Sequence, residues 1–465
     1  MASPPRQMSA YAQRLSRWSL NELSSSFPGL REALLHLDFV FRERVFSPVV
    51  TFWMFLSQVL SDGASCQEMV AKALAALWLT EAKQASTDNS AYCQARKRLP
   101  ESFLKRLAEQ TASQLECQVN LKHLWMGRHV KIVDGSSLSM PDTAANQKSY
   151  PQPDGQKPGC GFPVMRLVVV FSLATGVLLR MARGSLRQSE RALFQSLIDI
   201  LQPGEILLAD RGFCSFADIY VLMARGIDAV LRVPKYRLIG ARGKKQLGRG
   251  DRLVEWIQSE KICPAWMELK IWNEMPNKIT LREITYSVPV KGFRSKRIVL
   301  ATTLIDSKLF PKKAFVGLYL QRWKAELFLR DIKISLHMDI LRCKTPEMIH
   351  KELWMYLIAY NLIRTLMWSA AQHQGVCVLS ISFRSSLASI RQWVPWMVVL
   401  DSTLRRFSKT QNPFLDYLAQ QLVPYRPNRI QPRARKRRLK NYPLLTAPRK
   451  RFKEIHHRNH YRRMP

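Results

Sequence analysis

The sequence has few acidic residues relative to its basic ones. It contains 35 Asp and Glu against 72 Lys and Arg, which gives a formal net charge of +37 and an isoelectric point near 10.3. A chain with this charge repels itself strongly unless a polyanion neutralises it. The composition therefore favours a nucleic acid as partner, with an anionic membrane surface as the alternative.

The sequence also lacks long apolar runs and paired cysteines. Its most apolar stretches, residues 49–60 and 168–181, are interrupted by polar residues, so neither supplies the roughly 20 apolar residues that cross a bilayer. The amino terminus has no apolar segment typical of a secretory signal. The 8 cysteines include no Cys-x-x-Cys pair, which argues against a zinc ribbon and for reduced thiols. We therefore expect a cytoplasmic protein without a membrane segment.

The chain is long enough to form several domains. Its 465 residues are 47% hydrophobic, which excludes wholesale disorder and allows about two to four domains. Residues 1–128 are predicted to be helical: residues 48–59 are apolar and follow a Ser47-Pro48 helix start, and residues 66–79 are rich in Ala. Residues 346–424 are also predicted to form helices. Residues 425–465 are rich in Arg, Lys and Pro and are expected to form a disordered, DNA-binding tail.

Residues 86–100 predict a short basic helix after several capping residues. A helix of this kind suits a helix-turn-helix reader of DNA, but a solvated basic helix has the same composition. Both interpretations stay open. The candidate DNA-binding side chains on it are Tyr92, Gln94, Arg96 and Arg98.

From residue 129 the hydrophobic pattern changes to that of strands. We expect strands at residues 130–134, 165–173, 177–181, 206–210 and 229–233, and helices at 189–201 and 215–225. These elements predict a mixed α/β sheet over residues 129–234. Residues 235–296 are interpreted as an inserted β-rich subdomain with strands at 267–272 and 279–288. Residues 298–303 then return to the main sheet, within a second part of that domain at residues 297–345.

Residues 319–333 predict a helix with a charged face. At about 100° per residue, Tyr319, Arg322, Glu326 and Lys333 fall within roughly 60° of one another, opposite an apolar stripe. Trp323 and Arg330 lie at the edges of this face. The alternative is a surface ion pair between Glu326 and Arg330, worth only ~0.3–0.5 kcal/mol.

Three carboxylates are candidates for a metal site. Asp134 and Asp210 each follow an apolar strand, and ligands of open α/β sheets bind at such strand ends. If these strands are neighbours, Glu326 on its helix can close the third side. Clustered carboxylates favour Mg²⁺ or Mn²⁺, and two such ions suit cleavage of a phosphodiester. For each Asp taken alone, a cap at a strand-to-helix turn is the better interpretation; the metal site is favoured by the three carboxylates together with the net charge.

Three segments resemble the signature of the bacterial insertion-sequence-four family of DDE transposases. They are Ile132-Val133-Asp134-Gly135-Ser136, Ala209-Asp210-Arg211-Gly212-Phe213, and the spacing Tyr319-x2-Arg322-x3-Glu326-x6-Lys333. Residues 90–100 are also similar to the amino-terminal region of family members. The similarity covers roughly residues 45–370.

The resemblance implies a ribonuclease H-like catalytic domain with a β-rich insertion. It implies two Mg²⁺ ions, replaceable by Mn²⁺, on Asp134, Asp210 and Glu326, and phosphate contacts by Tyr319, Arg322 and Lys333. Arg211, Trp323 and Arg330 are further DNA-binding candidates. The implied activity is cut-and-paste transposition by a homodimer on double-stranded DNA in a bacterial cytoplasm, at the nucleoid.

Some relatives release the element through a DNA hairpin, with a Trp stacked on a flipped base. No Trp stands directly before the returning strand here, and Trp272, Phe293 and Trp323 are the candidates to replace it. The main alternative function is a catalytically silent DNA-binding regulator on the same scaffold. A basic membrane-surface or RNA-binding protein ranks last, because no RNA-recognition motif is evident.

Overall fold

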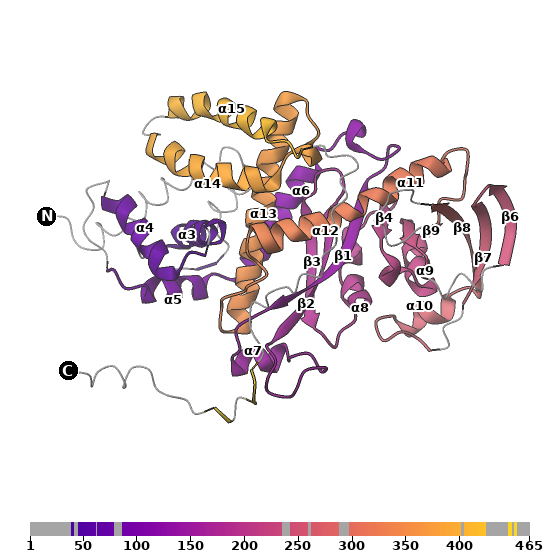
Figure 1. The fold of residues 1–465 in the computed structure, drawn as a ribbon, viewed down its shortest axis with the longest axis horizontal. Helices are drawn as coiled ribbons and strands as arrows, with labels where there is room; N and C mark the ends of the chain where they lie inside the picture. Colours follow the sequence, from indigo (N-terminus) through magenta and orange to yellow (C-terminus); the bar gives the residue numbers. More distant parts are fainter. Residues whose placement is uncertain are drawn as a thin grey trace.

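The computed structural model describes residues 39–40, 45–61, 63–78, 86–234, 242–258, 262–287, 297–400, 404–424, 445–448 and 451–452. Figure 1 shows helices α3 to α5 at one end of the molecule, a helix-covered sheet in the middle and the outer strands β6 to β8 at the other end. Residues 425–465, which are predicted to form a disordered tail, lie almost wholly outside the described residues.

The described part of the amino-terminal region is helical, as predicted. It comprises α3 (Pro48–Leu60), α4 (Cys66–Trp78), α5 (Ser90–Arg98), α6 (Glu101–Glu116) and the short 3-10 helix η2 (Leu121–His123). Helix α3 begins as the sequence indicates, because the Ser47 hydroxyl accepts a hydrogen bond from the Val50 N–H and Pro48 occupies the first turn.

In the described residues, nine strands form a single mixed sheet in the order β3-β2-β1-β4-β5-β9-β8-β7-β6. Strand β4 is parallel to both of its neighbours, β1 and β5. All other neighbouring strands are antiparallel. The first and fourth strands are therefore neighbours, which is the condition on which the predicted site depends. The strands are β1 (Val130–Ser139), β2 (Val164–Ser172), β3 (Leu178–Ser185), β4 (Ile206–Ala209), β5 (Asp228–Arg232), β6 (Arg242–Gly248), β7 (Asp251–Ile257), β8 (Lys278–Ser287) and β9 (Arg297–Thr302).

Strand β1 is longer than predicted. It does not end at Asp134 but continues to Ser139, because β2 pairs with it along its whole length, as far as Ser139↔Val164. The predicted hairpin of β2 and β3 is confirmed. Its turn requires Gly176, which has φ 73° and would place a side-chain Cβ 3.0 Å from the ring of Phe328.

The helix predicted at residues 189–201 is broken into two. The chain forms α8 (Glu190–Gln195) and the 3-10 helix η3 (Ile198–Ile200), because the Leu197 N–H bonds the carbonyl of Phe194, only three residues back. The helix at residues 215–225 is confirmed as α9 (Phe216–Ala224). Two short elements were not predicted, α7 (Ala144–Ser149) and the 3-10 helix η4 (Arg211–Phe213).

Strands β6 to β8 lie in the segment that the sequence marked as a β-rich insertion. They continue the main sheet through the β8–β9 pair, and the described residues form no separate sheet, so a distinct subdomain is not confirmed. The strand predicted at residues 267–272 is wrong. That segment forms helix α10 (Leu269–Glu274), in keeping with its Glu, Leu and Lys residues, which favour helices.

The helix predicted at residues 319–333 is divided. Helix α11 (Lys312–Gln321) and α12 (Trp323–Arg330) meet at Arg322, where hydrogen bonds span three residues instead of four, and the π-helix η6 (Asp331–Ser335) follows. The widened turn of η6 is closed by a bond from the Leu336 N–H to the Asp331 carbonyl.

The carboxy-terminal helices are α13 (Pro346–Gln374), the 3-10 helix η7 (Val378–Ser380), α14 (Phe383–Leu400) and α15 (Leu404–Gln420). Helix α13, predicted at residues 348–372, is buried over most of its length and packs on α3, α6, α14 and α15. Figure 1 shows it running between the sheet and the amino-terminal helices. None of the described helices is long and apolar enough to cross a membrane.

Candidate active site

Asp134 lies in β1 at the point where β1 and β4 separate. The last parallel pair between these strands is Ile132↔Leu208, and β1 continues alongside β2, where Asp134 faces Val169. Ligands of open α/β sheets bind at the carboxyl ends of parallel strands. Asp134 is therefore at a position where a bound ligand is expected.

The face of the sheet on which Asp134 lies follows from strand alternation. Ile132 faces Phe171 across the β1–β2 pair, and the Phe171 ring lies 5.3 Å from that of Phe328 in α12. Because side chains alternate between faces, Asp134 points to the same face as Ile132. Asp134 therefore points toward α12, the helix that carries Glu326.

Gly135 lies on the opposite face of the sheet. A Cβ atom at this position would stand 2.5 Å from the carboxyl carbon of Glu190 in α8, so any larger residue would displace that side chain. The Gly after Asp134 in the predicted signature is thus required by the packing of α8 on β1. Its N–H donates to Asp134 Oδ1 over 2.9 Å and helps to orient the carboxylate.

Asp210 follows β4 directly. Its Oδ1 accepts a hydrogen bond of 2.7 Å from the Gly212 N–H, and the residue thereby caps η4. This is the capping role that the sequence allowed. Capping uses one carboxylate oxygen, and Asp210 lies close enough to Asp134 for its charge to act on that residue.

Glu326 is held by an ion pair with Arg322. The distance from Arg322 Nη2 to Glu326 Oε1 is 2.7 Å, and the side chains are 15% and 41% exposed respectively. The ion pair between Glu326 and Arg330, considered as the alternative to a metal site, is not formed among the described residues; Arg330 instead pairs with Asp331 at 3.6 Å. The charge of Glu326 is therefore paired with that of Arg322, four residues earlier in the chain.

Electrostatic interactions link the three carboxylates. Burial, the largest cause, and the charges of Asp210 and Glu326 together raise the pKa of Asp134 to about 6, against the opposing effects of Arg322 and of the Gly135 N–H. The negative charge of Asp134 is thus under-compensated by the protein. Strong perturbation of this kind is typical of functional sites.

Tyr319 and Lys333 lie near the residues that carry the carboxylates. Tyr319 is buried, which raises the pKa of its phenol and keeps it protonated, and the Arg322 guanidinium lies 6.0 Å from its ring. The ammonium of Lys333 donates to Ser136 Oγ over 3.0 Å and to the Ser137 carbonyl over 2.9 Å. Lys333 therefore reaches β1 two residues beyond Asp134.

The donor set fits a hard divalent cation in its chemistry. Three carboxylates from β1, β4 and α12 act on one another electrostatically, and oxygen ligands of this type bind Mg²⁺ or Mn²⁺. In the conformation observed, however, no three His, Cys, Asp or Glu side chains of the described residues are arranged to hold an ion. In this conformation Glu326 is paired with Arg322 and does not form such a group with Asp134 and Asp210.

The remaining predicted DNA contacts fall into two groups. Arg211, Trp323 and Arg330 are exposed next to the carboxylates in sequence, and Gln94 and Arg98 are exposed on α5. Trp272, a candidate for base stacking, is half-buried against the core, and Phe293 lies outside the described residues.

Tyr92 and Arg96 are buried, which contradicts their prediction as DNA contacts. Tyr92 is fully buried, and Arg96 lies with its guanidinium 3.9 Å from the ring centre of Phe55 and donates to Cys66 Sγ over 3.0 Å. Their helical spacing places both on the side of α5 that packs on α3. The sequence could not show which side of the short basic helix faces the interior.

Arg232 is a residue of this site that the sequence analysis missed. It ends β5, and the preceding residue Leu231 pairs with Ala209, so Arg232 lies level with Asp210 on the neighbouring parallel strand. Its charge acts on the buried Tyr319 hydroxyl. The available signal was a basic residue at the carboxyl end of a predicted strand.

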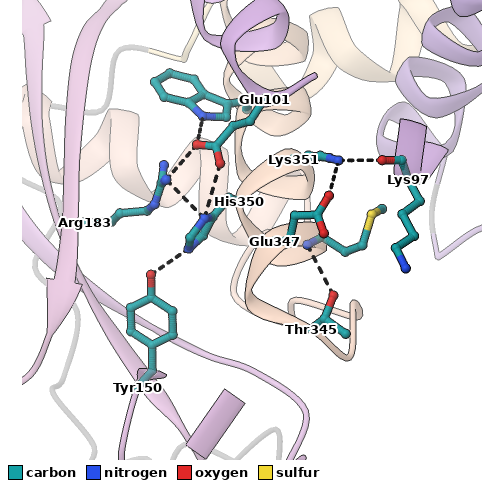
Figure 2. A network of polar contacts seen from close by, with 10 residues as sticks. Lys97, Glu101, Tyr150, Arg183, Thr345, Glu347, His350 and Lys351 are labelled. Atoms are coloured by element: carbon teal, nitrogen blue, oxygen red, sulfur yellow. Dashed lines mark hydrogen bonds and ion pairs between the residues drawn. The ribbon is translucent and has the colours of Figure 1, made fainter. Parts of the chain in front are cut away.

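A second carboxylate, Glu101, has surroundings opposite to those of Asp134. Figure 2 shows Glu101 of α6 meeting Arg183 of β3 and His350 of α13, with Tyr150 on the far side of His350. Arg183 donates to Glu101 Oε1 over 2.6 Å, and Trp354 Nε1 donates to the same oxygen over 3.0 Å. Burial would raise the pKa of Glu101, but hydrogen bonds from His350, Trp354 and Arg183 lower it to about 2.

Comparison with known proteins matches this chain to transposases. Residues 125–362 match the family described as the transposase DDE domain. The chain is 29% identical over 364 residues to the transposase InsG for insertion sequence element IS4 of Escherichia coli (strain K12), covering 78% of this chain and 79% of InsG. It is 29% identical over 153 residues to the putative transposase InsZ of the same strain, covering 33% of this chain and 51% of InsZ.

One solved structure aligns over most of the chain. The piggyBac transposase in its synaptic complex with hairpin DNA covers 90% of this chain and 86% of its own, with 8% identity and a TM-score of 0.42. This similarity is too low to support an argument about the site.

Proposed function

The chain belongs to the DDE transposase family and is a DNA transposase of the IS4 type, and we propose that it cuts DNA at the inverted-repeat ends of an insertion sequence and joins the freed ends to target DNA. The observation that carries this proposal is that Asp210, directly after β4, and Glu326, in α12, both lie close enough to Asp134 in β1 for their charges to raise its pKa. The alternative of a catalytically silent regulator is not favoured, because a protein that only binds DNA has no need to hold an under-compensated carboxylate such as Asp134 beside two others.

Asp134, Asp210 and Glu326 are proposed to hold two Mg²⁺ ions, for which Mn²⁺ can substitute. When bound, these ions would activate a water or a 3′-hydroxyl and neutralise charge on the leaving oxygen. The contribution of the protein is to fix the carboxylates. Gly135 orients Asp134, Gly212 orients Asp210, and α12 delivers Glu326 to the face of the sheet on which Asp134 lies.

Cationic and hydroxyl groups around the carboxylates are proposed to bind the DNA backbone. Arg322 has the planar guanidinium that binds phosphate through two parallel hydrogen bonds, and Lys333 offers a point charge beside β1. Tyr319 remains a neutral donor because its phenol is protonated. Arg211, Trp323 and Arg330, all exposed, would contact DNA further from the cut.

The division of the chain into domains is also proposed. Residues 129–234 and 297–345 would form a ribonuclease H-like domain, which the order β3-β2-β1-β4-β5 supports, with residues 235–296 inserted. Residues 1–128 would bind the element ends, using Gln94 and Arg98 of α5. Residues 346–424 would contribute to a homodimer that holds two ends together, and residues 425–465 would bind DNA non-specifically. The protein would act at the bacterial nucleoid.

The test is cleavage of duplex DNA that carries the terminal repeats flanking the gene. Wild-type protein is expected to cut it with Mg²⁺ or Mn²⁺, and Asp134→Ala, Asp210→Ala and Glu326→Ala are each expected to bind the DNA without cutting it. Retained cleavage in all three variants would refute the assignment of the site. Binding without cleavage by the wild-type protein in both metals would instead support a silent regulator.

A further inference from the structure

Arg322 occupies the position of a cation among the three carboxylates. Its guanidinium bonds Glu326 at 2.7 Å, and its charge is the strongest influence that opposes the rise in the pKa of Asp134. The same carboxylates, Asp134 and Glu326, in turn favour the charged form of Arg322, which burial opposes. One half-buried arginine thus balances part of the negative charge that a divalent ion would otherwise neutralise.

The exposures of the two partners indicate which of them can move. Glu326 is 41% exposed and Arg322 only 15%, so the glutamate can change rotamer at small cost while the guanidinium stays packed beside Tyr319. The two residues are four apart, across the start of α12, and this spacing brings their side chains together whenever no other ligand is bound. A rotation of Glu326 away from Arg322 would uncover the guanidinium.

We propose that Arg322 holds Glu326 out of the metal site until a DNA phosphate takes the place of the glutamate on the guanidinium. The inference rests on the proposed function, because it assumes that Glu326 is a metal ligand. Phosphate binds a guanidinium through two hydrogen bonds and replaces the carboxylate without loss of charge pairing. Glu326 is then released toward Asp134 and Asp210, so the third ligand becomes available only when DNA is in place.

This exchange makes metal affinity depend on DNA, and the dependence is reciprocal. A ligand that improves the binding of a second one must itself be bound more tightly in its presence. Without DNA, a divalent ion has to displace Arg322 from Glu326. With DNA bound, a phosphate already occupies the Arg322 guanidinium, so Arg322 no longer competes with the ion for Glu326. The arrangement would prevent hydrolysis by a loaded site before the correct phosphate is seated.

The test measures Mn²⁺ binding by the electron paramagnetic resonance signal of the free ion, with full-length protein. Wild type and Arg322→Met are compared with and without a duplex that ends at the cleavage position, so that no turnover occurs. Methionine replaces the packed stem of Arg322 but cannot bind Glu326. Without DNA, Arg322→Met should bind Mn²⁺ about tenfold more tightly than wild type, the effect of removing one charge-assisted hydrogen bond. DNA should tighten binding about tenfold in wild type and less than about twofold in Arg322→Met.

A double-mutant cycle separates release of Glu326 from a general change in charge. If Arg322 acts by holding Glu326, Arg322→Met has no effect on residual Mn²⁺ binding in a Glu326→Gln background. If it only repels cations, it tightens binding in both backgrounds, and the proposal fails. Arg225→Met is the matched control, since Arg225 forms an ion pair of 2.7 Å with Asp199 and is 45% exposed. It should bind Mn²⁺ as wild type does.

The outcomes distinguish this proposal from the proposed function. Equal Mn²⁺ affinities of wild type and Arg322→Met, with loss of binding in Glu326→Gln, would overturn the role of Arg322 and leave the catalytic site intact. Wild-type Mn²⁺ binding and cleavage by Glu326→Gln would overturn both. Arg322→Gln serves as a second variant if Arg322→Met does not fold.

Discussion

Asp134 in β1 and Glu101 at the start of α6 are both carboxylates packed between secondary-structure elements, with an arginine nearby. Burial and the neighbouring Asp210 and Glu326 raise the pKa of Asp134 to about 6. Donors from β3 and α13 lower the pKa of Glu101 to about 2, although burial opposes this. The fold therefore supplies Glu101 with enough hydrogen-bond donors and positive charge to stabilise its carboxylate, whereas it does not do so for Asp134. A carboxylate that joins helices and sheet is satisfied internally, whereas one kept for an external cation is not.

The largest expected effect separates the two residues by activity. Asp134→Asn should reduce DNA cleavage by on the order of 10³-fold or more, because it removes a proposed metal ligand. Glu101→Gln should change cleavage by less than about threefold at 25 °C, where most molecules remain folded. Single-turnover cleavage by both variants measures this, and a similar loss in both would remove the distinction.

The next effect separates them by stability. In metal-free protein at pH 8, Glu101→Gln should lower the free energy of unfolding by about 2 kcal/mol, because three donors lose a charged acceptor. Asp134→Asn should raise it by about 1 kcal/mol, because an unfavourable buried charge is removed. Urea denaturation in the presence of a chelator gives both values. Destabilisation by Asp134→Asn would show that its charge is satisfied within the protein.

The pH dependence of stability should also run in opposite directions. The pKa of Glu101 is lowered from 4.5 to about 2, so its contribution is complete above about pH 4.5 and is lost as the pH falls toward 2. The pKa of Asp134 is raised from 3.8 to about 6, so its cost is absent below pH 3.8 and complete above about pH 6. The deficit of Glu101→Gln should therefore shrink between pH 5 and pH 3, while the gain of Asp134→Asn grows between pH 4 and pH 7. Denaturation curves across this range test both directions.

The smallest effect is expected for exposed cations beside the site. They are neither part of the Glu101 network nor proposed metal ligands. Arg211→Gln should leave the free energy of unfolding within about 0.5 kcal/mol of wild type. It should weaken binding to all DNA by about threefold and reduce the slope of log affinity against log salt by about one, because one phosphate contact releases one counterion. Arg225→Gln, at a distant surface ion pair, is the control. An unchanged salt slope for Arg211→Gln would exclude the phosphate contact.

Patterns that depend on local spacing predicted much of the fold. The Ser47-Pro48 start of α3, the hairpin turn at Gly176 and the apolar strand before Asp210 are each fixed by residues within a few positions of one another. The continuous apolar run of residues 206–209 also agrees with a strand buried between parallel neighbours, as β4 is between β1 and β5.

Features that depend on distant partners could not be predicted in the same way. Strand β1 extends to Ser139 because β2 pairs with it. The π-helix η6 begins at Asp331, whose carboxylate meets Arg364 of α13 at 3.4 Å, and no pattern within residues 319–333 contains that partner. Arg96 looked like a surface cation because its neighbours are polar, yet Cys343, far along the chain, accepts from it in the interior.

The same distinction between local spacing and tertiary contacts applies to the residues of the candidate site. Asp134, Asp210 and Glu326 were identified from residue type and spacing, and the structure places their charges within reach of one another. The pairing of Glu326 with Arg322 rather than Arg330 was not foreseen. Both arginines are four residues from the glutamate, and only the tightened turn at Arg322 and the burial of its side chain decide between them.

The unbroken hydrogen-bonded ladder from β6 to β3 has a mechanical consequence. Strand β9 is bonded on one edge to β8 and on the other to β5, directly next to the strand that precedes Asp210. Because each of these strands is hydrogen-bonded to the next, a displacement of β8 acts on β9 and, through it, on β5. A ligand that displaces the outer strands is therefore expected to change amide exchange along β5, the strand next to the one that precedes Asp210.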